Sequence, residues 1–192
     1  MLSTETLTQI NNIQEKYRGK TIVFCCSAFD ILHCGHILML EDCKRQGDIL
    51  VVGLHTDPTL DRKNKNKPIQ EYEEREIQIK GCRYVDEIIK YDTEEDLYNI
   101  LKELNPHVRV LGTDWEGKKF TGYDLPIKIH WHKRDHQWST SYLRERVYEA
   151  ELFKRDFGKV KEFMTPTIDL SNEHIDSFVR YIPPVGNYFP IL

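Results

Sequence analysis

Two histidines with a glycine between them form the sequence feature with the clearest chemical meaning. His33 and His36 stand three residues apart, with Gly35 between them, shortly after the apolar run of residues 21–26. Side chains three apart at a helix start face the same way, and the amides and dipole there favour an anion. Two imidazoles can donate hydrogen bonds to phosphate oxygens as charge builds on them. Gly35 would let the backbone come close to such a ligand.

A second phosphate-binding feature lies near the end of the predicted domain. Arg134 offers a forked donor to phosphate oxygens. Ser139 and Thr140 are expected to open the last helix, where their hydroxyls and the helix amides suit further phosphates. Serine or threonine at this position also caps helices in any protein, so capping alone is the structural alternative.

The apolar pattern predicts the elements that position these residues. Strands are expected at 21–26, 49–54, 84–89, 108–111 and 126–131, and helices at 3–17, 37–47, 71–82, 94–104 and 139–154. This alternation predicts an α/β fold, a Rossmann-like doubly wound parallel sheet. Ligands in such sheets bind beyond the carboxyl ends of the strands. The segments expected there are 27–36, 112–117 and 134–141.

With these elements in order, the sequence resembles the cytidylyltransferase branch of the nucleotidyltransferases that carry a His-x-Gly-His signature. The resemblance covers roughly residues 20–150 and is greatest to the glycerol-3-phosphate cytidylyltransferases. It rests on the segments 29–36, 74–75, 83–87, 111–117 and 138–140. It implies a domain at 20–150, preceded by a helical extension at 1–19. The extension at 151–192 is apolar enough to pack, so we expect it to form an arm over this domain or across a dimer partner.

The resemblance implies a reaction. CTP and a phosphate monoester, expected to be glycerol 3-phosphate, would give CDP-glycerol and pyrophosphate by direct in-line attack on the α-phosphorus. Such a transfer needs mainly positioning and charge stabilisation. His33, His36 and Arg134 are the expected catalytic residues. Mg²⁺ would travel with the CTP phosphates, so no protein metal site is expected.

The resemblance also implies how the base is read. The Asp114 carboxylate would accept a hydrogen bond from the exocyclic amine of cytosine, where uracil presents a carbonyl. Trp115 either forms part of the base pocket or is a core aromatic residue at a strand end. The other expected nucleotide-binding residues are Ala28, Phe29, Asp30, Gly35, Lys65, Lys67, Gly112, Ser139 and Thr140.

Two parts of the implied site are open to more than one interpretation. Lys63, Lys65 and Lys67 share a polar loop, and the spacing does not decide which of them reaches CTP. Arg83 would bind the acceptor phosphate together with Asp86, or else serve as a surface partner of nearby carboxylates.

The sequence departs from the family at two places. Ser27 and Ala28 stand where the family has Gly-Thr, which removes a hydroxyl. Asp135, His136 and Gln137 lie where the acceptor or triphosphate should pass, which puts acceptor identity in doubt. The alternatives are therefore another phospho-alcohol as acceptor, an adenylyltransferase of the same fold, or an inactive nucleotide-binding module. A metal site from His130, His132 and His136 is disfavoured because no further ligand is indicated.

Composition limits the class of protein. The 192 residues carry 27 Lys and Arg against 31 Asp and Glu, so a strongly basic nucleic-acid binder is disfavoured. No apolar run reaches the ~18–20 residues of a membrane span, and the amino terminus does not resemble a secretory signal. Five cysteines without a Cys-x-x-Cys pair indicate reduced thiols. We therefore expect a cytoplasmic enzyme, and the resemblance implies a homodimer.

Overall fold

The computed structural model describes residues 1–63 and 65–163, the stretch 156–163 by its helical backbone alone. Most of the extension expected at 151–192 lies outside the described residues. A first compact unit comprises Met1–Arg144, and the second begins at Glu145. Helix α5, Thr140–Phe163, continues through residue 150, where the resemblance implies the end of the domain.

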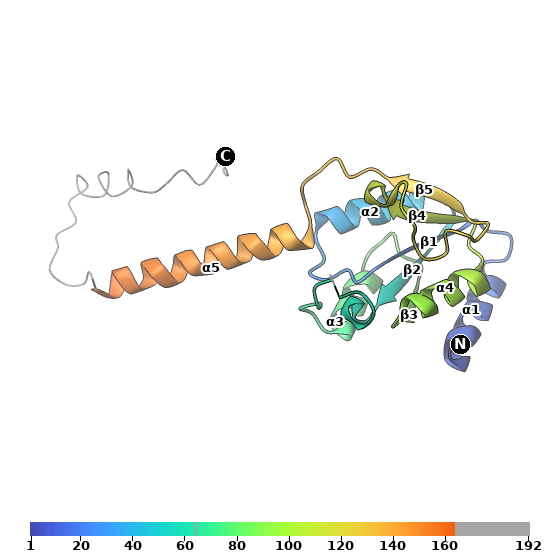
Figure 1. Ribbon diagram of the computed structural model, residues 1–192, viewed down its shortest axis with the longest axis horizontal. Coiled ribbons are helices and arrows are strands. Elements are labelled where there is room, and N and C mark those ends of the chain that lie inside the picture. Colours follow the sequence, from blue (N-terminus) through green and yellow to red (C-terminus); the bar gives the residue numbers. More distant parts are fainter. Residues whose placement is uncertain (64, 164–192) are drawn as a thin grey trace. The chain divides into compact units, whose positions relative to one another are not determined.

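Five parallel strands form one sheet in the first unit (Figure 1). They are β1 (Ile22–Ser27), β2 (Ile49–His55), β3 (Glu87–Tyr91), β4 (Val108–Gly112) and β5 (Lys128–His132). Their order is β3-β2-β1-β4-β5, so the direction of winding reverses between β1 and β4. The predicted Rossmann-like fold class is confirmed, and a crevice for a ligand is expected where the order reverses.

Helices cover both faces of this sheet (Figure 1). On one face, α1 (Thr4–Lys16) and α4 (Glu94–Leu104) pack on Phe24, Val51 and Ile89. On the other face, α2 (Cys34–Arg45) and α3 (Tyr72–Lys80) pack on Val23 and Val52. Alternate residues of one strand therefore enter opposite cores, as expected for strands that are buried on both faces.

The amino-terminal helix belongs to the core. Ile10 and Ile13 of α1 are buried in the same cluster as the α4 leucines. The Gln14 amide donates hydrogen bonds to the carbonyl oxygens of Glu103 and Leu104 at the end of α4. Residues 1–19, expected to form an extension, therefore complete one face of the sheet.

Strand β3 begins three residues later than the pattern at 84–89 predicts. Val85 donates its amide to the carbonyl of Cys82 in a turn, and the Asp86 amide donates to Leu50 on β2. Tyr84 and Val85 still pack partly against the core, which is why their apolar side chains resemble a strand. Among the described residues, no helix is long and apolar enough to cross a membrane.

Candidate active site

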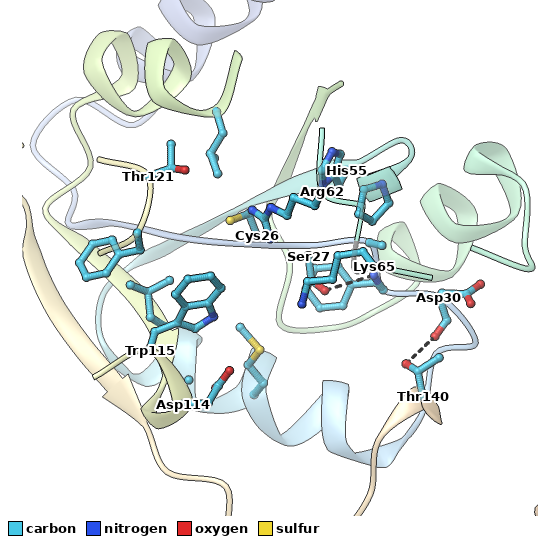
Figure 2. A pocket seen from close by; sticks show the side chains of 18 of the residues that line it. Cys26, Ser27, Asp30, His55, Arg62, Lys65, Asp114, Trp115, Thr121 and Thr140 are labelled. Atoms are coloured by element: carbon cyan, nitrogen blue, oxygen red, sulfur yellow. Dashed lines mark hydrogen bonds between the residues drawn. The ribbon is translucent and has the colours of Figure 1, made fainter. Parts of the chain in front are cut away.

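A cleft of about 620 Å³ lies at the carboxyl ends of β1 and β4. This is the place where the strand order reverses. Figure 2 shows Asp114 and Trp115 on one side of it and Lys65, Asp30 and Thr140 on the other. Ten residues predicted from the sequence line the cleft: Ala28, Phe29, Asp30, His36, Lys65, Gly112, Asp114, Trp115, Arg134 and Thr140.

The two predicted histidines form a stacked pair at the start of α2. Their ring centroids lie 3.8 Å apart with planes at 23°. His33 is the N-cap, because its Nδ1 accepts a hydrogen bond from the Gly35 amide at 3.1 Å. His36 lines the cleft and meets the edge of Phe29 at 5.2 Å. The pair thus presents one ring to the cleft and uses the other to hold the turn.

Both imidazoles are kept neutral. Burial, followed by the charges of His33 and Arg134, lowers the pKa of His36 to about 3. Burial also lowers the pKa of His33, with contributions from His136 and Arg134. A bound phosphate would bring negative charge beside these groups and favour their protonated forms. Neutral rings can donate one hydrogen bond each to phosphate oxygens.

Asp30 holds the loop that covers the site. Its Oδ1 accepts the amides of Ile69 and Gln70 at 3.0 Å each, while Oδ2 is buried without a hydrogen-bond partner in the described part of the chain. Phe29 and Ile31, on either side, have φ of 50° and 48°. Left-handed backbone costs residues with a Cβ roughly 1–2 kcal/mol each. The turn after β1 is therefore strained, and Asp30 fastens it to the segment before α3.

Arg75 organises the same region, a role that the sequence reasoning missed. It is only 1% exposed. Its guanidinium donates to the carbonyl oxygens of Ala28, His55 and Thr56 at 2.6–2.7 Å and of Gln70 at 3.1 Å. It therefore ties the ends of β1 and β2 to the start of α3. The Glu74-Arg75 pair marked the resemblance, but spacing gave no sign of four carbonyl partners.

Gly35 has a different use from the one predicted. It does not line the cleft. A Cβ at this position would lie 2.8 Å from the Trp138 carbonyl oxygen and 2.9 Å from His136 Cε1. The glycine therefore accommodates the segment after β5 rather than a ligand. Thr140 fastens the same segment, since its Oγ1 donates to the Asp30 carbonyl at 3.2 Å. These contacts bring the predicted phosphate-binding feature at 134–140 to the histidine pair.

Ser139 caps a helix, which is the structural alternative to phosphate binding that the sequence left open. Its Oγ accepts the Tyr142 amide at 3.2 Å, so it caps α5. Ser139 does not line the cleft, whereas Thr140 does.

Asp114 and Trp115 lie on the short 3₁₀ turn η2 (Thr113–Trp115) after β4. The Arg62 guanidinium lies over the Trp115 ring, 6.0 Å from its centroid. The Asp114 carboxylate is exposed to the cleft and folds back over Gly112, leaving no room there for a Cβ. Trp115 is thus a wall of the cleft, and Gly112 shapes it through its lack of a side chain.

Several predicted residues lie outside the cleft. Of the three lysines in the polar loop, Lys65 lines the cleft, but Lys63 and Lys67 do not. Asp86 is a correction: its Oδ2 accepts Lys44 Nζ at 2.5 Å and the Leu50 amide at 2.7 Å. Leu50 lies near the start of β2, whereas the cleft lies at the carboxyl ends of the strands. Asp86 therefore stabilises the amino-terminal end of the strands, opposite the cleft, and does not bind a substrate in this cleft.

Arg83, the partner expected for Asp86, is also absent from the lining of the cleft. Its guanidinium lies over the Tyr84 ring, 5.7 Å from the centroid. Both residues belong to the turn before β3, whose amino-terminal position keeps them away from the site.

Several basic residues of the cleft had no motif to reveal them. Arg62 pairs with Glu94 at the start of α4, and Glu94 also accepts the Thr121 hydroxyl. Arg62 and Lys119 come from the loops after β2 and β4, and Arg144 comes from helix α5, so only the fold brings them together. The lining residues of this kind are Arg62, Lys119, Arg144 and the almost fully buried Arg109.

His130 and His132 face one carboxylate. His132 Nδ1 lies 2.7 Å and His130 Nε2 3.1 Å from Asp42 Oδ2. Within the part of the chain that the structure describes, no three His, Cys, Asp or Glu residues gather as a metal site would require. The basic and imidazole donors of the cleft instead suit an anion such as a phosphate.

The fold and the cleft define an α/β domain suited to a nucleotide. The family profile described as cytidylyltransferase-like matches residues 24–146, so the chain belongs to this family of nucleotidyltransferases. The implied homodimer stays a prediction.

Among curated proteins, the chain is similar to bifunctional protein HldE of Wolinella succinogenes, with 39% identity over 130 residues, 67% of this chain and 27% of that protein. HldE of Aliarcobacter butzleri is 33% identical over 150 residues, 77% of this chain and 31% of that protein. The alignments thus span less than a third of these relatives. They support the family and leave the narrower expectation of a CDP-glycerol enzyme without support.

Solved structures agree on the fold. The lipopolysaccharide core biosynthesis protein of Thermoplasma volcanium has a TM-score of 0.50 and 31% identity, over 62% of this chain and all of that one. The pantoate-beta-alanine ligase of Francisella tularensis has a TM-score of 0.50 and 18% identity, over 68% of this chain and 66% of that one. The second likeness is one of fold alone.

Proposed function

We propose that this chain transfers a nucleotidyl group from a nucleoside triphosphate to a phosphorylated sugar. A phosphate oxygen of the acceptor attacks the α-phosphorus, and the bond from that phosphorus to the bridging oxygen of pyrophosphate breaks. The observation that carries the proposal is the convergence of His36, Arg134 and Thr140 on one cleft at the carboxyl ends of β1 and β4.

The chain's own residues have distinct tasks in this step. His36 donates a hydrogen bond to an α-phosphate oxygen, and His33 holds the turn that presents it. Arg134 and Lys65 balance the negative charge that develops on the leaving pyrophosphate. Mg²⁺ bound to the triphosphate would neutralise further charge there.

The Asp114 carboxylate favours a nucleotide with adenine or cytosine as its base, but it does not distinguish between these two. A carboxylate accepts a hydrogen bond from an exocyclic amine, which both cytosine and adenine carry. Guanine and uracil present a carbonyl at the corresponding position, which would face the carboxylate unfavourably. The lining of the cleft by Asp114 therefore supports ATP or CTP as donor over GTP or UTP.

The similarity to bifunctional protein HldE and to a lipopolysaccharide core biosynthesis protein favours ATP as the donor and a sugar phosphate as the acceptor. The core of lipopolysaccharide is built from sugars, so a phosphorylated sugar is the acceptor class with the most support. CTP with glycerol 3-phosphate is the second candidate, favoured by the resemblance carried by the motif at 111–117.

The test is pyrophosphate release with four nucleoside triphosphates and a panel of acceptors: hexose and heptose 1-phosphates, glycerol 3-phosphate, phosphoethanolamine and phosphocholine. Turnover with ATP and a sugar phosphate supports the first candidate. Faster turnover with CTP and glycerol 3-phosphate would replace it with the second. No release from any pair would contradict nucleotidyl transfer.

A further inference from the structure

His136 occupies a position beside the histidine pair that the proposed reaction has not used. It belongs to the segment between β5 and α5, and its ring stacks on Trp138 with centroids 5.0 Å apart and planes at 26°. Its Cε1 would lie 2.9 Å from a Cβ on Gly35. The ring therefore lies against the middle of the turn that carries His33 and His36.

Both nitrogens of this ring are unpaired. His136 Nδ1 and Nε2 are buried from solvent, and neither has a hydrogen-bond partner among the described residues. A neutral imidazole has one donor and one acceptor, and buried polar groups nearly always find a partner. Burying both without one is unfavourable, so an apolar ring would be the better filler if packing were the only task.

Other unpaired polar atoms lie in the same region. His36 Nδ1 and Asp30 Oδ2 are also buried without partners. His36 and Asp30 line the cleft, as does Arg134 on the segment that carries His136. The His136 ring itself is not among the lining residues, so it would turn toward the cleft to reach a ligand there. Hydrogen-bonding capacity left open at the histidine turn and on the neighbouring segment indicates a polar ligand held between them.

Phosphate oxygens are the ligand chemistry that these groups fit. The cations Arg134 and Lys65 line the same cleft, which favours an anion. An imidazole N–H can donate to a phosphate oxygen beside a guanidinium fork without adding a fixed charge of its own. Asp135, the adjacent carboxylate, is exposed and pairs with Lys133 at 3.4 Å, so it does not take this place.

We propose that His136 is a third phosphate-binding imidazole of this site and donates a hydrogen bond to the triphosphate of the bound nucleotide. This inference rests on the proposed function for its ligand, and it concerns binding rather than transfer. It explains why a histidine stands against Gly35, where stacking and packing alone would be served by an apolar ring.

The test compares His136→Phe with His136→Gln by calorimetric titration of the full chain with ATP and CTP, without acceptor. Phenylalanine keeps the stack on Trp138 and the contact with Gly35 but has no N–H. Glutamine loses the ring but keeps a donor at a similar reach. AMP and CMP serve as ligands without the β- and γ-phosphates, and Asn11→Ala, exposed on α1 away from the cleft, is the control.

We expect His136→Phe to weaken binding of the triphosphate at least about fivefold, as loss of a hydrogen bond to a charged group does. Binding of the monophosphate should change less than about twofold, and glutamine should recover part of the loss. Unchanged triphosphate binding by His136→Phe would overturn the inference, as would an equal loss for the monophosphate. Melting temperatures near that of the parent chain confirm that the variants fold.

The binding test of His136 can fail or succeed independently of the pyrophosphate-release test of the proposed function. If the parent chain binds a triphosphate but releases no pyrophosphate with any acceptor, the proposed function fails while the His136 comparison is still read from binding. If the parent chain turns over and His136→Phe binds normally, only the role of His136 fails. If no triphosphate binds the parent chain, both are contradicted.

Discussion

Asp42 Oδ2 lies 2.7 Å from His132 Nδ1, which joins helix α2 to the last residue of β5. Helix α2 begins with the histidine turn, and β5 leads two residues later to Arg134. His130 Nε2 shares the same carboxylate at 3.1 Å. One carboxylate that lies outside the site therefore ties the helix of the histidine turn to the strand that leads to Arg134.

This tie predicts that Asp42→Ala lowers both stability and turnover. Removing the carboxylate leaves two half-buried imidazoles without their partner, which costs about 1–3 kcal/mol in the free energy of unfolding. Turnover should fall because Arg134 and His36 lose their fixed spacing. Denaturant unfolding and steady-state kinetics measure the two effects, with Glu41→Ala, which removes only the surface ion pair with Arg45 on α2, as control. A variant with normal stability and turnover would show that the tie is dispensable.

His36→Ala tests the chemistry of the histidine pair. Removing a donor that acts mainly in the transition state lowers turnover by about 10²–10³-fold. Binding of the triphosphate should change much less, because most of its contacts come from elsewhere in the cleft. Cys34→Ala, an exposed position in the same turn, is the matched control. Near-normal turnover of His36→Ala with the best donor and acceptor pair would rule out this role.

The lowered pKa of His36 predicts how stability depends on pH. The unfolded chain binds a proton on this residue below its ordinary pKa of 6.5, while the folded chain resists until about pH 3. Stability therefore falls as pH drops from about 7 toward 4, by up to about 1.4 kcal/mol per pH unit from this group. His33 and His55, whose pKa values burial also lowers, act in the same direction.

The measurement is urea unfolding of the parent chain and of His36→Phe between pH 7 and pH 4.5. The variant lacks the titrating group, so its stability should fall less steeply with acid. Parallel slopes for the two proteins would contradict the neutral buried imidazole.

The sequence predicted the parts of this molecule that local pattern encodes. Strand β2 and helix α4 follow their apolar periodicity, and α4 has the bounds 94–104 that its pattern predicts. The histidine turn was found because its chemistry is contained in residues 30–36. Each of these depends on neighbours within one element, so spacing alone was enough.

Contacts between elements that are distant in the sequence were beyond such reasoning. Arg75 takes four carbonyls from three segments, and nothing near residue 75 records them. Gly35 was assigned to the ligand because the residues that cover it, His136 and Trp138, come a hundred positions later. Asp86 fits its family motif but lies at the wrong end of the strands, which only the register of β2 and β3 reveals.

Asp114→Ala tests the reading of the base. The parent chain should prefer ATP and CTP to GTP and UTP, since only the first two carry the exocyclic amine. Removing the carboxylate should narrow that preference by about tenfold or more, because a well-placed hydrogen bond to a base is worth about 1–3 kcal/mol. Competition among the four triphosphates gives the ratio directly. Glu116→Ala, exposed on the same loop, is the control, and an unchanged ratio in Asp114→Ala would assign the base to other residues.

Arg75→Met tests whether the site depends on a residue that does not line it. Methionine fills much of the volume but leaves the carbonyls of Ala28, His55 and Thr56 without their donor in a buried place. We expect a loss of about 3–5 kcal/mol in the free energy of unfolding, because each buried carbonyl left without its donor costs about 1–3 kcal/mol. Arg75→Lys keeps the charge but lacks the planar fork, so it should recover only part of this. Arg18→Ala, on the exposed surface, is the control and should leave stability unchanged. An Arg75→Met variant as stable as the parent would mean that other contacts hold the strained backbone of the turn after β1.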